Sequence, residues 1–249
     1  MTAPNSNLGT LFVTGASSGI GAATARYFLS QGWHVGLFAR RAEALADVAG
    51  GAPNAHVLPG DVTDAAQVEA AIATFAETTG RLDVLFNNAG VFTPPRPPDE
   101  IPLADWDLAL AVNLRGMGVT ARAAFAQMRR QSPQGGRILN NGSISATSPR
   151  EGAGPYTVTK HAITGLTRQI ALDGRAFSIA CGQIDIGNAE TEILRTIVDR
   201  ARATGATPPP MFDVEEVARA VWHMATLPPE ANVLSMTLMA TTMPYVGRG

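Results

Sequence analysis

Two side chains four residues apart, Tyr156 and Lys160, have the types and the spacing of an acid–base pair. On a helix, residues four positions apart lie on one face, one turn from each other. An ammonium group at that distance stabilises a phenolate over a phenol, because an opposite charge favours the ionised form. A tyrosine supported in this way can give a proton to a carbonyl oxygen or take one from an alcohol. Tyr156 is therefore a candidate acid and base for a carbonyl–alcohol pair.

A glycine-rich segment near the amino terminus adds a second kind of chemistry. The segment Thr14-Gly15-Ala16-Ser17-Ser18-Gly19-Ile20-Gly21 follows a short apolar run and precedes a helical pattern. Such a turn lets the backbone approach a pyrophosphate, which the N–H groups and the positive dipole end of the following helix stabilise. The alternative is that these glycines only allow tight packing between a strand and a helix. The strand before the turn and the helix after it favour a nucleotide site.

Short β-rich apolar segments alternate with longer helical segments, which predicts a parallel sheet with helices on both faces. We expect strands at Thr10–Thr14, Trp33–Ala39, His56–Leu58, Leu82–Phe86, Ile138–Asn141, Ser178–Ile184 and Val233–Met239. We expect helices from the glycine-rich turn to Gln31 and at Ala42–Ala49, Asp64–Thr79, Leu103–Arg130, Tyr156–Asp173, Thr191–Thr204 and Asp213–Thr226. The fold class is thus α/β: a single doubly wound Rossmann-type domain over residues 1–249, with a parallel sheet of about seven strands flanked by helices.

Composition points away from several other classes of protein. The formal net charge is −2, so no global field favours nucleic acid or an anionic membrane surface. The sequence contains no uncharged apolar run of 18 residues, so we expect no transmembrane helix. Met1–Asn7 lacks the cationic and apolar regions of a signal peptide. The only cysteine, Cys181, lies in an apolar strand pattern, and the four histidines show no ligand spacing. We therefore expect a soluble cytoplasmic protein with no metal site, no nucleic-acid partner and no membrane partner.

Further motifs give the chain a resemblance to the short-chain dehydrogenase/reductase family, over roughly residues 8–240. Besides the glycine-rich turn, the motifs are Asp61-Val62, Asn87-Asn88-Ala89-Gly90, Asn113, Ser143 and the pair Tyr156 and Lys160, in family order. Each lies at the carboxyl end of an expected strand or on the following helix, where ligands bind in open α/β sheets. The resemblance implies an oxidoreductase that interconverts a ketone or aldehyde and the corresponding alcohol by hydride transfer, acting on a small-molecule substrate.

The resemblance also implies residue roles. Tyr156 would donate the proton in reduction, and Ser143, thirteen residues upstream, would hold the substrate carbonyl oxygen. Lys160 would bind the nicotinamide ribose and support Tyr156, while Asn113 would hold a water that completes a proton relay. The implied cofactor-binding residues are Gly15, Ser17, Ser18, Gly19, Ile20, Gly21, Arg40, Arg41, Asp61, Val62, Asn88, Ala89, Gly90, Tyr156, Lys160, Gly187, Ala189 and Thr191.

The end of the second expected strand indicates which cofactor is preferred. An NAD enzyme usually places an acidic residue there to bond the ribose 2′-OH. This chain has Ala39 followed by Arg40 and Arg41, which suit a 2′-phosphate. NADP(H) is therefore preferred and NAD(H) possible, unless the two arginines are only solvated or paired with Glu43 or Asp47. An NAD-dependent alcohol dehydrogenase of the same family and a non-catalytic nucleotide-binding sensor remain as alternatives.

The resemblance implies a homodimer or homotetramer, because relatives usually associate through the helices that correspond to Leu103–Arg130 and Tyr156–Asp173. The chain departs from the family pattern after the sixth strand, where Ile186-Gly187 replaces the usual Pro-Gly. It departs again before Ser143, where it reads Asn140-Asn141-Gly142. None of these positions is one of the four implied catalytic residues.

Overall fold

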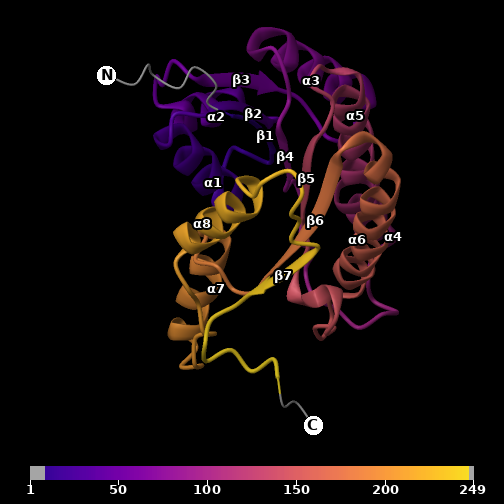
Figure 1. Ribbon diagram of the computed structural model, residues 1–249. Coiled ribbons are helices and arrows are strands. Elements are labelled where there is room, and N and C mark those ends of the chain that lie inside the picture. The colour runs from indigo at the N-terminus through magenta and orange to yellow at the C-terminus, as the bar shows by residue number, and fades with distance from the viewer. Residues whose placement is uncertain (1–8, 247–249) are drawn as a thin grey trace.

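The computed structural model describes residues 9–246, and in this range seven parallel strands form a single sheet in the order β3-β2-β1-β4-β5-β6-β7 (Figure 1). This is the doubly wound Rossmann-type α/β fold that the sequence predicts, and every expected strand is present with slightly shifted ends. The expectation for Met1–Asn7 lies outside the described residues. The strands are β1 (Thr10–Thr14), β2 (His34–Ala39), β3 (Ala55–Pro59), β4 (Val84–Asn87), β5 (Gly136–Asn141), β6 (Ile179–Ile186) and β7 (Ser235–Leu238).

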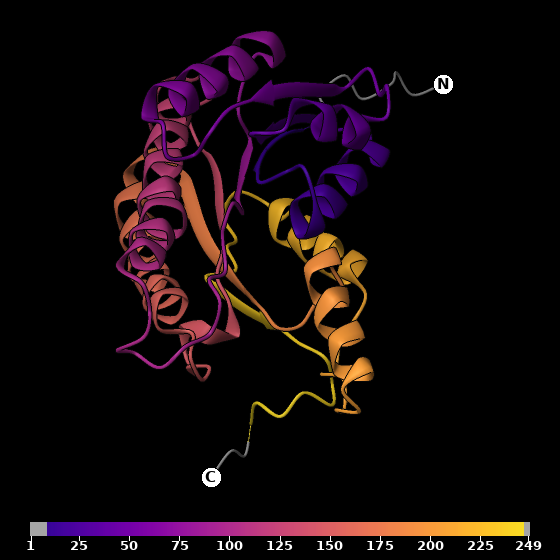
Figure 2. The same cartoon turned by 180° about the vertical axis from the view of Figure 1, so that it is seen from behind.

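Helices cover both faces of the sheet, as Figures 1 and 2 show from opposite sides. One layer holds α1 (Gly19–Ser30), α2 (Ala42–Ala49), α7 (Glu192–Ala203) and α8 (Val214–Ala225). The other layer holds α3 (Ala65–Thr79), α4 (Leu103–Ala109), α5 (Met117–Arg130) and α6 (Gly154–Asp173). Asp64 caps α3, because its Oδ1 accepts hydrogen bonds from the N–H groups of Ala66 and Gln67 at 2.9 and 3.2 Å. No helix within residues 9–246 is long and apolar enough to cross a membrane.

A hydrophobic core lies on each side of the sheet. Under α1 and α8 the rings of Phe28, Trp33 and Trp222 pack edge to face, with centroids 5.0–5.4 Å apart. Under α3 and α5 the core includes Phe12 and Phe75, both nearly inaccessible to solvent. Since the interior strands of a parallel sheet are buried on both faces, every residue of β1 is buried, with apolar side chains between its two terminal threonines. The two cores make the sheet a rigid platform for the loops at its edges.

The segment expected as one helix over residues 103–130 contains a π-helical stretch, Leu110–Gly116, between α4 and α5. A π-helix has a wider turn, which leaves main-chain groups without their usual partners. Here side chains supply hydrogen bonds to two main-chain carbonyls. Asn87 Nδ2 donates to the carbonyl of Met117 at 2.8 Å, and Thr120 Oγ1 donates to the carbonyl of Gly116 at 2.9 Å. The wide turn carries Asn113, which lies against the loop after β4.

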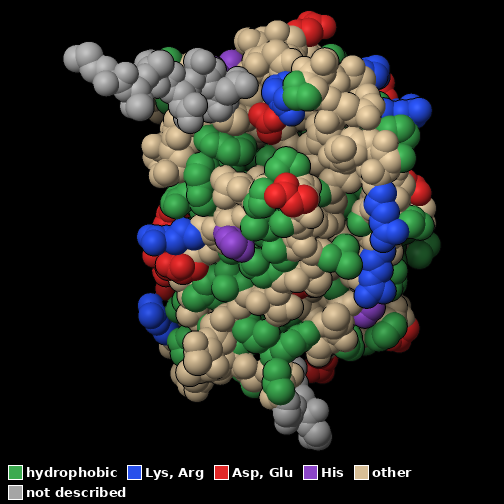
Figure 3. Space-filling model, in the orientation of Figure 1, with side chains coloured by type: hydrophobic (Ala, Val, Ile, Leu, Met, Phe, Trp, Pro, Cys, Tyr) green, Lys and Arg blue, Asp and Glu red, His purple; other side chains and the backbone are tan. Residues whose placement is uncertain are grey.

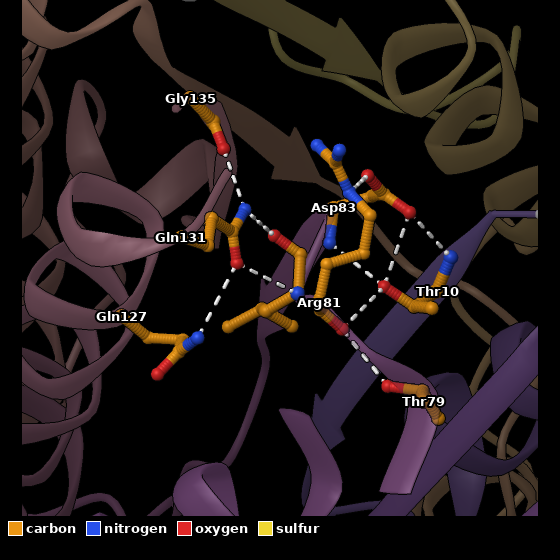
Figure 4. A network of polar contacts seen from close by, with 8 residues as sticks. Thr10, Thr79, Arg81, Asp83, Gln127, Gln131 and Gly135 are labelled. Carbon is orange, nitrogen blue, oxygen red and sulfur yellow. Dashed lines mark hydrogen bonds and ion pairs between the residues drawn. The ribbon is translucent and has the colours of Figure 1, made fainter. Parts of the chain in front are cut away.

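A polar network fastens the amino-terminal edge of the sheet, opposite the site described below (Figure 4). The carboxylate of Asp83 accepts hydrogen bonds from the N–H and the hydroxyl of Thr10 at 2.9 and 3.1 Å, and it pairs with Arg81. Gln131 bonds both main-chain groups of Leu82, which joins α5 to the start of β4. This edge is therefore structural, and the carboxyl edge remains for ligands.

Candidate active site

A cavity of about 620 Å³ opens at the carboxyl edge of the sheet, where the strand order reverses between β1 and β4. Ligands of open α/β sheets bind at such a switch point. The cavity is lined by the predicted residues Gly15, Ser17, Ser18, Gly19, Ile20, Arg40, Arg41, Asp61, Val62, Asn88, Ala89, Gly90, Tyr156, Lys160 and Thr191. Phe92 and Asn141 line it as well, together with Leu108 and Val112, which the sequence did not single out.

The glycine-rich turn brings the backbone of α1 close to β1. Gly15 has a φ of +67°, in the left-handed region that favours glycine. Gly21 lies behind the turn rather than on the cavity wall, and a Cβ there would stand 2.3 Å from the carbonyl oxygen of Gly15. The first turn of α1 has no acidic residue and no side-chain cap. Its N–H groups and dipole are thus available to a pyrophosphate, and the cradle fits a dinucleotide.

The end of β2 presents cations to the same cavity. Ala39, Arg40 and Arg41 all line it, and Arg41 Nη2 donates to Ser17 Oγ at 3.3 Å. Within residues 9–246, no carboxylate lies within ion-pairing distance of either guanidinium, Glu43 and Asp47 included. Two exposed cations beside the glycine-rich turn fit a ligand that carries an additional phosphate.

Lys160 is buried at the inner end of the cavity, with 3% of its surface exposed. Its Nζ donates to the carbonyl of Asn141 at 2.7 Å and lies 5.5 Å from the centre of the Tyr156 ring. A buried ammonium needs such a partner, because burial of a charge without hydrogen bonds is costly. The half-buried Tyr156 ring packs edge to face on Phe92, with centroids 5.1 Å apart. These contacts hold the phenol and the ammonium on one wall, as their spacing predicts.

Ser143 lies two residues beyond the end of β5, and it does not line the cavity itself. Its Oγ accepts a hydrogen bond from the N–H of Ser145 at 3.1 Å. Its own N–H donates to Asp185 Oδ1 at 2.9 Å. Because the hydroxyl oxygen already accepts a bond from the main chain, its proton remains free to be donated to a carbonyl oxygen.

Asn113 is buried, and its side-chain amide is used for structure. Its Oδ1 accepts from the N–H of Val91 at 2.7 Å, and its Nδ2 donates to the carbonyl of Val91 at 2.9 Å. A longer contact of 3.4 Å reaches Thr159 Oγ1 on α6. The amide therefore ties the loop after β4 to the π-helical turn, so a relay water at this position would bind the main chain rather than the side chain.

The loop after β6 carries the remaining predicted residues. Gly187 donates its N–H to the carbonyl of Leu238 at 2.8 Å, and Ala189 pairs with Phe212 through an isolated parallel bridge. Neither lines the cavity, whereas Thr191 does. The first two residues thus fasten the loop to neighbouring segments, and Thr191 faces the ligand space.

Sequence reasoning missed two polar residues of β6, Gln183 and Asp185, which are 3% and 6% exposed. Burial raises the pKa of the Asp185 carboxyl above its ordinary value, against opposing effects of the hydrogen bonds from Gln183 and Ser143 and of the Lys160 charge. The sequence does carry a signal for them, because these two polar residues interrupt a strand of otherwise apolar and small residues. Cys181 is buried, in keeping with the apolar strand pattern around it, and burial raises its pKa to about 12.

Comparison with known proteins shows likeness over nearly the whole chain. The family described as short chain dehydrogenase matches residues 9–202. Sulfoacetaldehyde reductase 2 from Chromohalobacter salexigens is 31% identical, over 93% of this chain and 94% of that protein. The NADP-dependent 3-hydroxy acid dehydrogenase of Escherichia coli K12 is 28% identical, over 95% of this chain and 97% of that protein. The solved closed form of serine dehydrogenase complexed with NADP+ is 26% identical, with a TM-score of 0.86 over 96% and 98% of the two chains.

Proposed function

Because the chain belongs to the short chain dehydrogenase family, whose named relatives act on alcohols and carbonyl compounds, we propose that it is an NADP(H)-dependent oxidoreductase that interconverts a ketone or aldehyde and the corresponding alcohol. The observation that carries this proposal is the placement of Tyr156 over the buried Lys160, at the inner end of a cavity with a dinucleotide cradle. We place the reaction in the cytoplasm and assign it to a single domain over residues 1–249.

The residues divide the work of carbonyl reduction. When bound, the nicotinamide cofactor supplies the hydride. Ser143 donates its hydroxyl proton in a hydrogen bond to the carbonyl oxygen and stabilises the charge that develops there. Tyr156 gives its proton to that oxygen as general acid. The Lys160 ammonium stabilises the phenolate that remains. Asn113 holds the main chain of Val91, and a relay water bound to the main chain there can return a proton to the phenolate.

A substrate panel tests the proposal directly. The named relatives act on a small aldehyde that carries a sulfonate and on hydroxy acids. We therefore expect turnover of small aldehydes, ketones or hydroxy acids with NADPH or NADP+, measured by the absorbance of the reduced cofactor. A larger apolar ketone belongs in the same panel, since Phe92, Leu108 and Val112 line the cavity. Cofactor binding without any turnover across the panel would favour the alternative of a nucleotide-binding sensor.

The cofactor preference should reside in Arg40. A charge-assisted hydrogen bond is worth ~1.5–3 kcal/mol, which corresponds to a preference of about 10- to 150-fold. NADP(H) should bind at least about tenfold more tightly than NAD(H), and Arg40→Ala should remove most of this gap with little effect on NAD(H). Ala39→Asp should shift the preference toward NAD(H), because a carboxylate accepts from the ribose 2′-OH and repels a phosphate. Fluorescence titration with both cofactors measures these affinities.

A matched control for this experiment is Arg219→Ala, which removes an exposed arginine of α8 that lies beside Glu216, away from the cavity. It should leave both affinities unchanged. Equal affinities of the wild type for the two cofactors, or a preference that survives Arg40→Ala, would contradict the assignment.

We further propose that the enzyme is a homodimer or homotetramer whose subunits meet through α5 and α6. A hollow of about 820 Å³ lies between these helices, lined by apolar residues such as Phe125, Leu166 and Ile170 together with several arginines. Figure 3 shows basic side chains along this side of the molecule. Leu172 on α6 is 53% exposed in the isolated chain. A second copy that covers this face would bury these apolar groups, and its Asp173 would be available to the arginines.

Light scattering at micromolar concentration should therefore give a multiple of the 26.0 kDa chain mass. Leu166→Arg, which places a charge in the hollow, should shift the protein toward the monomer. The control Val57→Arg places the same charge on the exposed side of β3 and should leave the assembly intact. A strictly monomeric wild type would refute the proposed interface.

A further inference from the structure

Asp185 lies on β6, is buried and accepts a hydrogen bond from the N–H of Ser143. We propose that it is a positioning residue, whose carboxylate fixes the main chain of Ser143 and offsets part of the Lys160 charge that acts on Tyr156. This inference rests on the proposed function, because it assigns a task within the same site. It concerns a buried residue that is not among those lining the cavity.

The geometry places Asp185 directly behind the catalytic serine. Its Oδ1 accepts two hydrogen bonds, from the N–H of Ser143 at 2.9 Å and from Gln183 Nε2 at 2.7 Å. The carboxylate lies so close to the chain that a Cβ at Gly142 would stand 2.1 Å from Oδ1. The residue before Ser143 must therefore be glycine for the carboxylate to reach the serine N–H.

The segment from Asn141 to Ser143 is held at its two ends by side chains of opposite charge. Lys160 Nζ holds the carbonyl of Asn141, and Asp185 Oδ1 holds the N–H of Ser143. Both hydrogen bonds involve a charged group and are stronger than neutral ones. Since Asn141 ends β5 and only Gly142 separates it from Ser143, these two hydrogen bonds set where the serine hydroxyl lies relative to Tyr156.

The charge environment of Asp185 is simple. Among the described residues, Lys160 of α6 is the charged group that acts on it, while β5 presents Asn141, β7 presents Thr237 in register and β6 presents Gln183. Burial disfavours the carboxylate, whereas the two hydrogen bonds and the ammonium favour it. One negative and one positive charge thus share a site of low dielectric, and each reduces the effect of the other on nearby groups.

The charge of Asp185 should make the ionisation of Tyr156 harder. Removal of this charge leaves the ammonium uncompensated, so the Tyr156 phenolate becomes easier to form. Asp185→Asn retains an Oδ1 that can accept both hydrogen bonds, removes the negative charge and replaces Oδ2 by an NH2 group. A merely structural role would lower the rate equally at every pH, whereas the electrostatic role moves the pH profile toward lower pH. Lys160→Met should move it the opposite way.

The test measures tyrosinate formation without cofactor or substrate. The chain has three tyrosines, so the near-ultraviolet titration of the wild type minus that of Tyr156→Phe isolates Tyr156. In the Asp185→Asn background the midpoint of this difference curve should shift to lower pH by roughly 0.5–1 pH unit. The acid limb of the pH profile of alcohol oxidation should shift in the same direction. Lysine-selective isotope labelling adds a direct readout, because Lys160 is the only lysine in the sequence and gives one side-chain resonance. That resonance should change its titration in the variant.

The control is Asp83→Asn at the opposite edge of the sheet, where the carboxylate also accepts a main-chain N–H bond, from Thr10 (Figure 4). It should leave both the difference curve and the pH profile in place. Asp185→Ala removes the acceptor as well as the charge, so kcat should fall by about tenfold or more while the affinity for the cofactor stays within about twofold.

Two failures are distinguishable. An active wild type whose Tyr156 titration and pH profile do not move in Asp185→Asn would overturn the role of Asp185 and leave the oxidoreductase assignment intact. A wild type without turnover would overturn that assignment, while the titration of the free protein would still show whether the charge of Asp185 acts on Tyr156. Circular dichroism verifies that each variant is folded over the pH range used.

Discussion

The Tyr156→Phe variant should keep its fold and its cofactor affinity and lose about 10²–10⁴-fold in turnover. The substitution removes only the hydroxyl, so the edge-to-face contact of the ring with Phe92 remains. Without the hydroxyl no group at this position can give a proton to the carbonyl oxygen, and the hydrogen bond from Ser143 has to stabilise the charge alone. The measurement is kcat and KM for the best substrate of the panel, together with a fluorescence titration of the cofactor.

Tyr27→Phe is the matched control, because Tyr27 is half buried on α1 and packs on Trp222, away from the carboxyl edge of the site. It should retain wild-type turnover. If Tyr156→Phe also turned over near the wild-type rate, Tyr156 would have no part in the proton transfer and another acid would have to be sought.

The fold could be predicted from local patterns because each element carries its own signal. The apolar runs gave all seven strands, and the Asp64 cap marks the start of α3. The π-helical stretch at Leu110–Gly116 could not be predicted. It depends on Asn87, a residue more than twenty positions earlier, which supplies the hydrogen bond that the wider turn requires at Met117. Such a partner is visible only once β4 and α5 are placed side by side.

The site shows the same division between local and long-range information. The Tyr156 and Lys160 pair follows from helical spacing, and the structure places both side chains on one wall of the cavity. The task of the Asn113 amide does not follow from the sequence, since its partner Val91 belongs to another loop. Asp185 was missed because it is the pairing of β5 with β6 that brings it behind Ser143. Motif spacing therefore predicts the candidate catalytic residues, whereas the residues packed behind them become visible only from the register of the strands.

Lys160→Met should reduce both cofactor affinity and rate, and should shift the pH profile toward higher pH. Methionine has a similar length but neither charge nor hydrogen-bond donor, so the phenolate of Tyr156 loses its stabilising ammonium and forms only at higher pH. The carbonyl of the buried Asn141 also loses its 2.7 Å partner. An unpaired buried polar group costs ~1–3 kcal/mol, so the free energy of unfolding should fall by about that amount.

Arg168→Met is the control on the same helix, two turns further on, where the arginine is exposed and removal of its charge should change neither profile nor affinity. The decisive quantity is the position of the acid limb of alcohol oxidation, measured across pH in both variants. We expect a rise of about one pH unit or more for Lys160→Met, with a loss of about 10²-fold in kcat/KM near neutral pH. A reduced rate with an unmoved limb would mean that Lys160 holds the cofactor and the Asn141 main chain but does not set the ionisation of Tyr156. In that case the proposed effect of Asp185 on Tyr156 would lose its basis too. Asp185 is proposed to act on the phenol by offsetting the charge of the Lys160 ammonium.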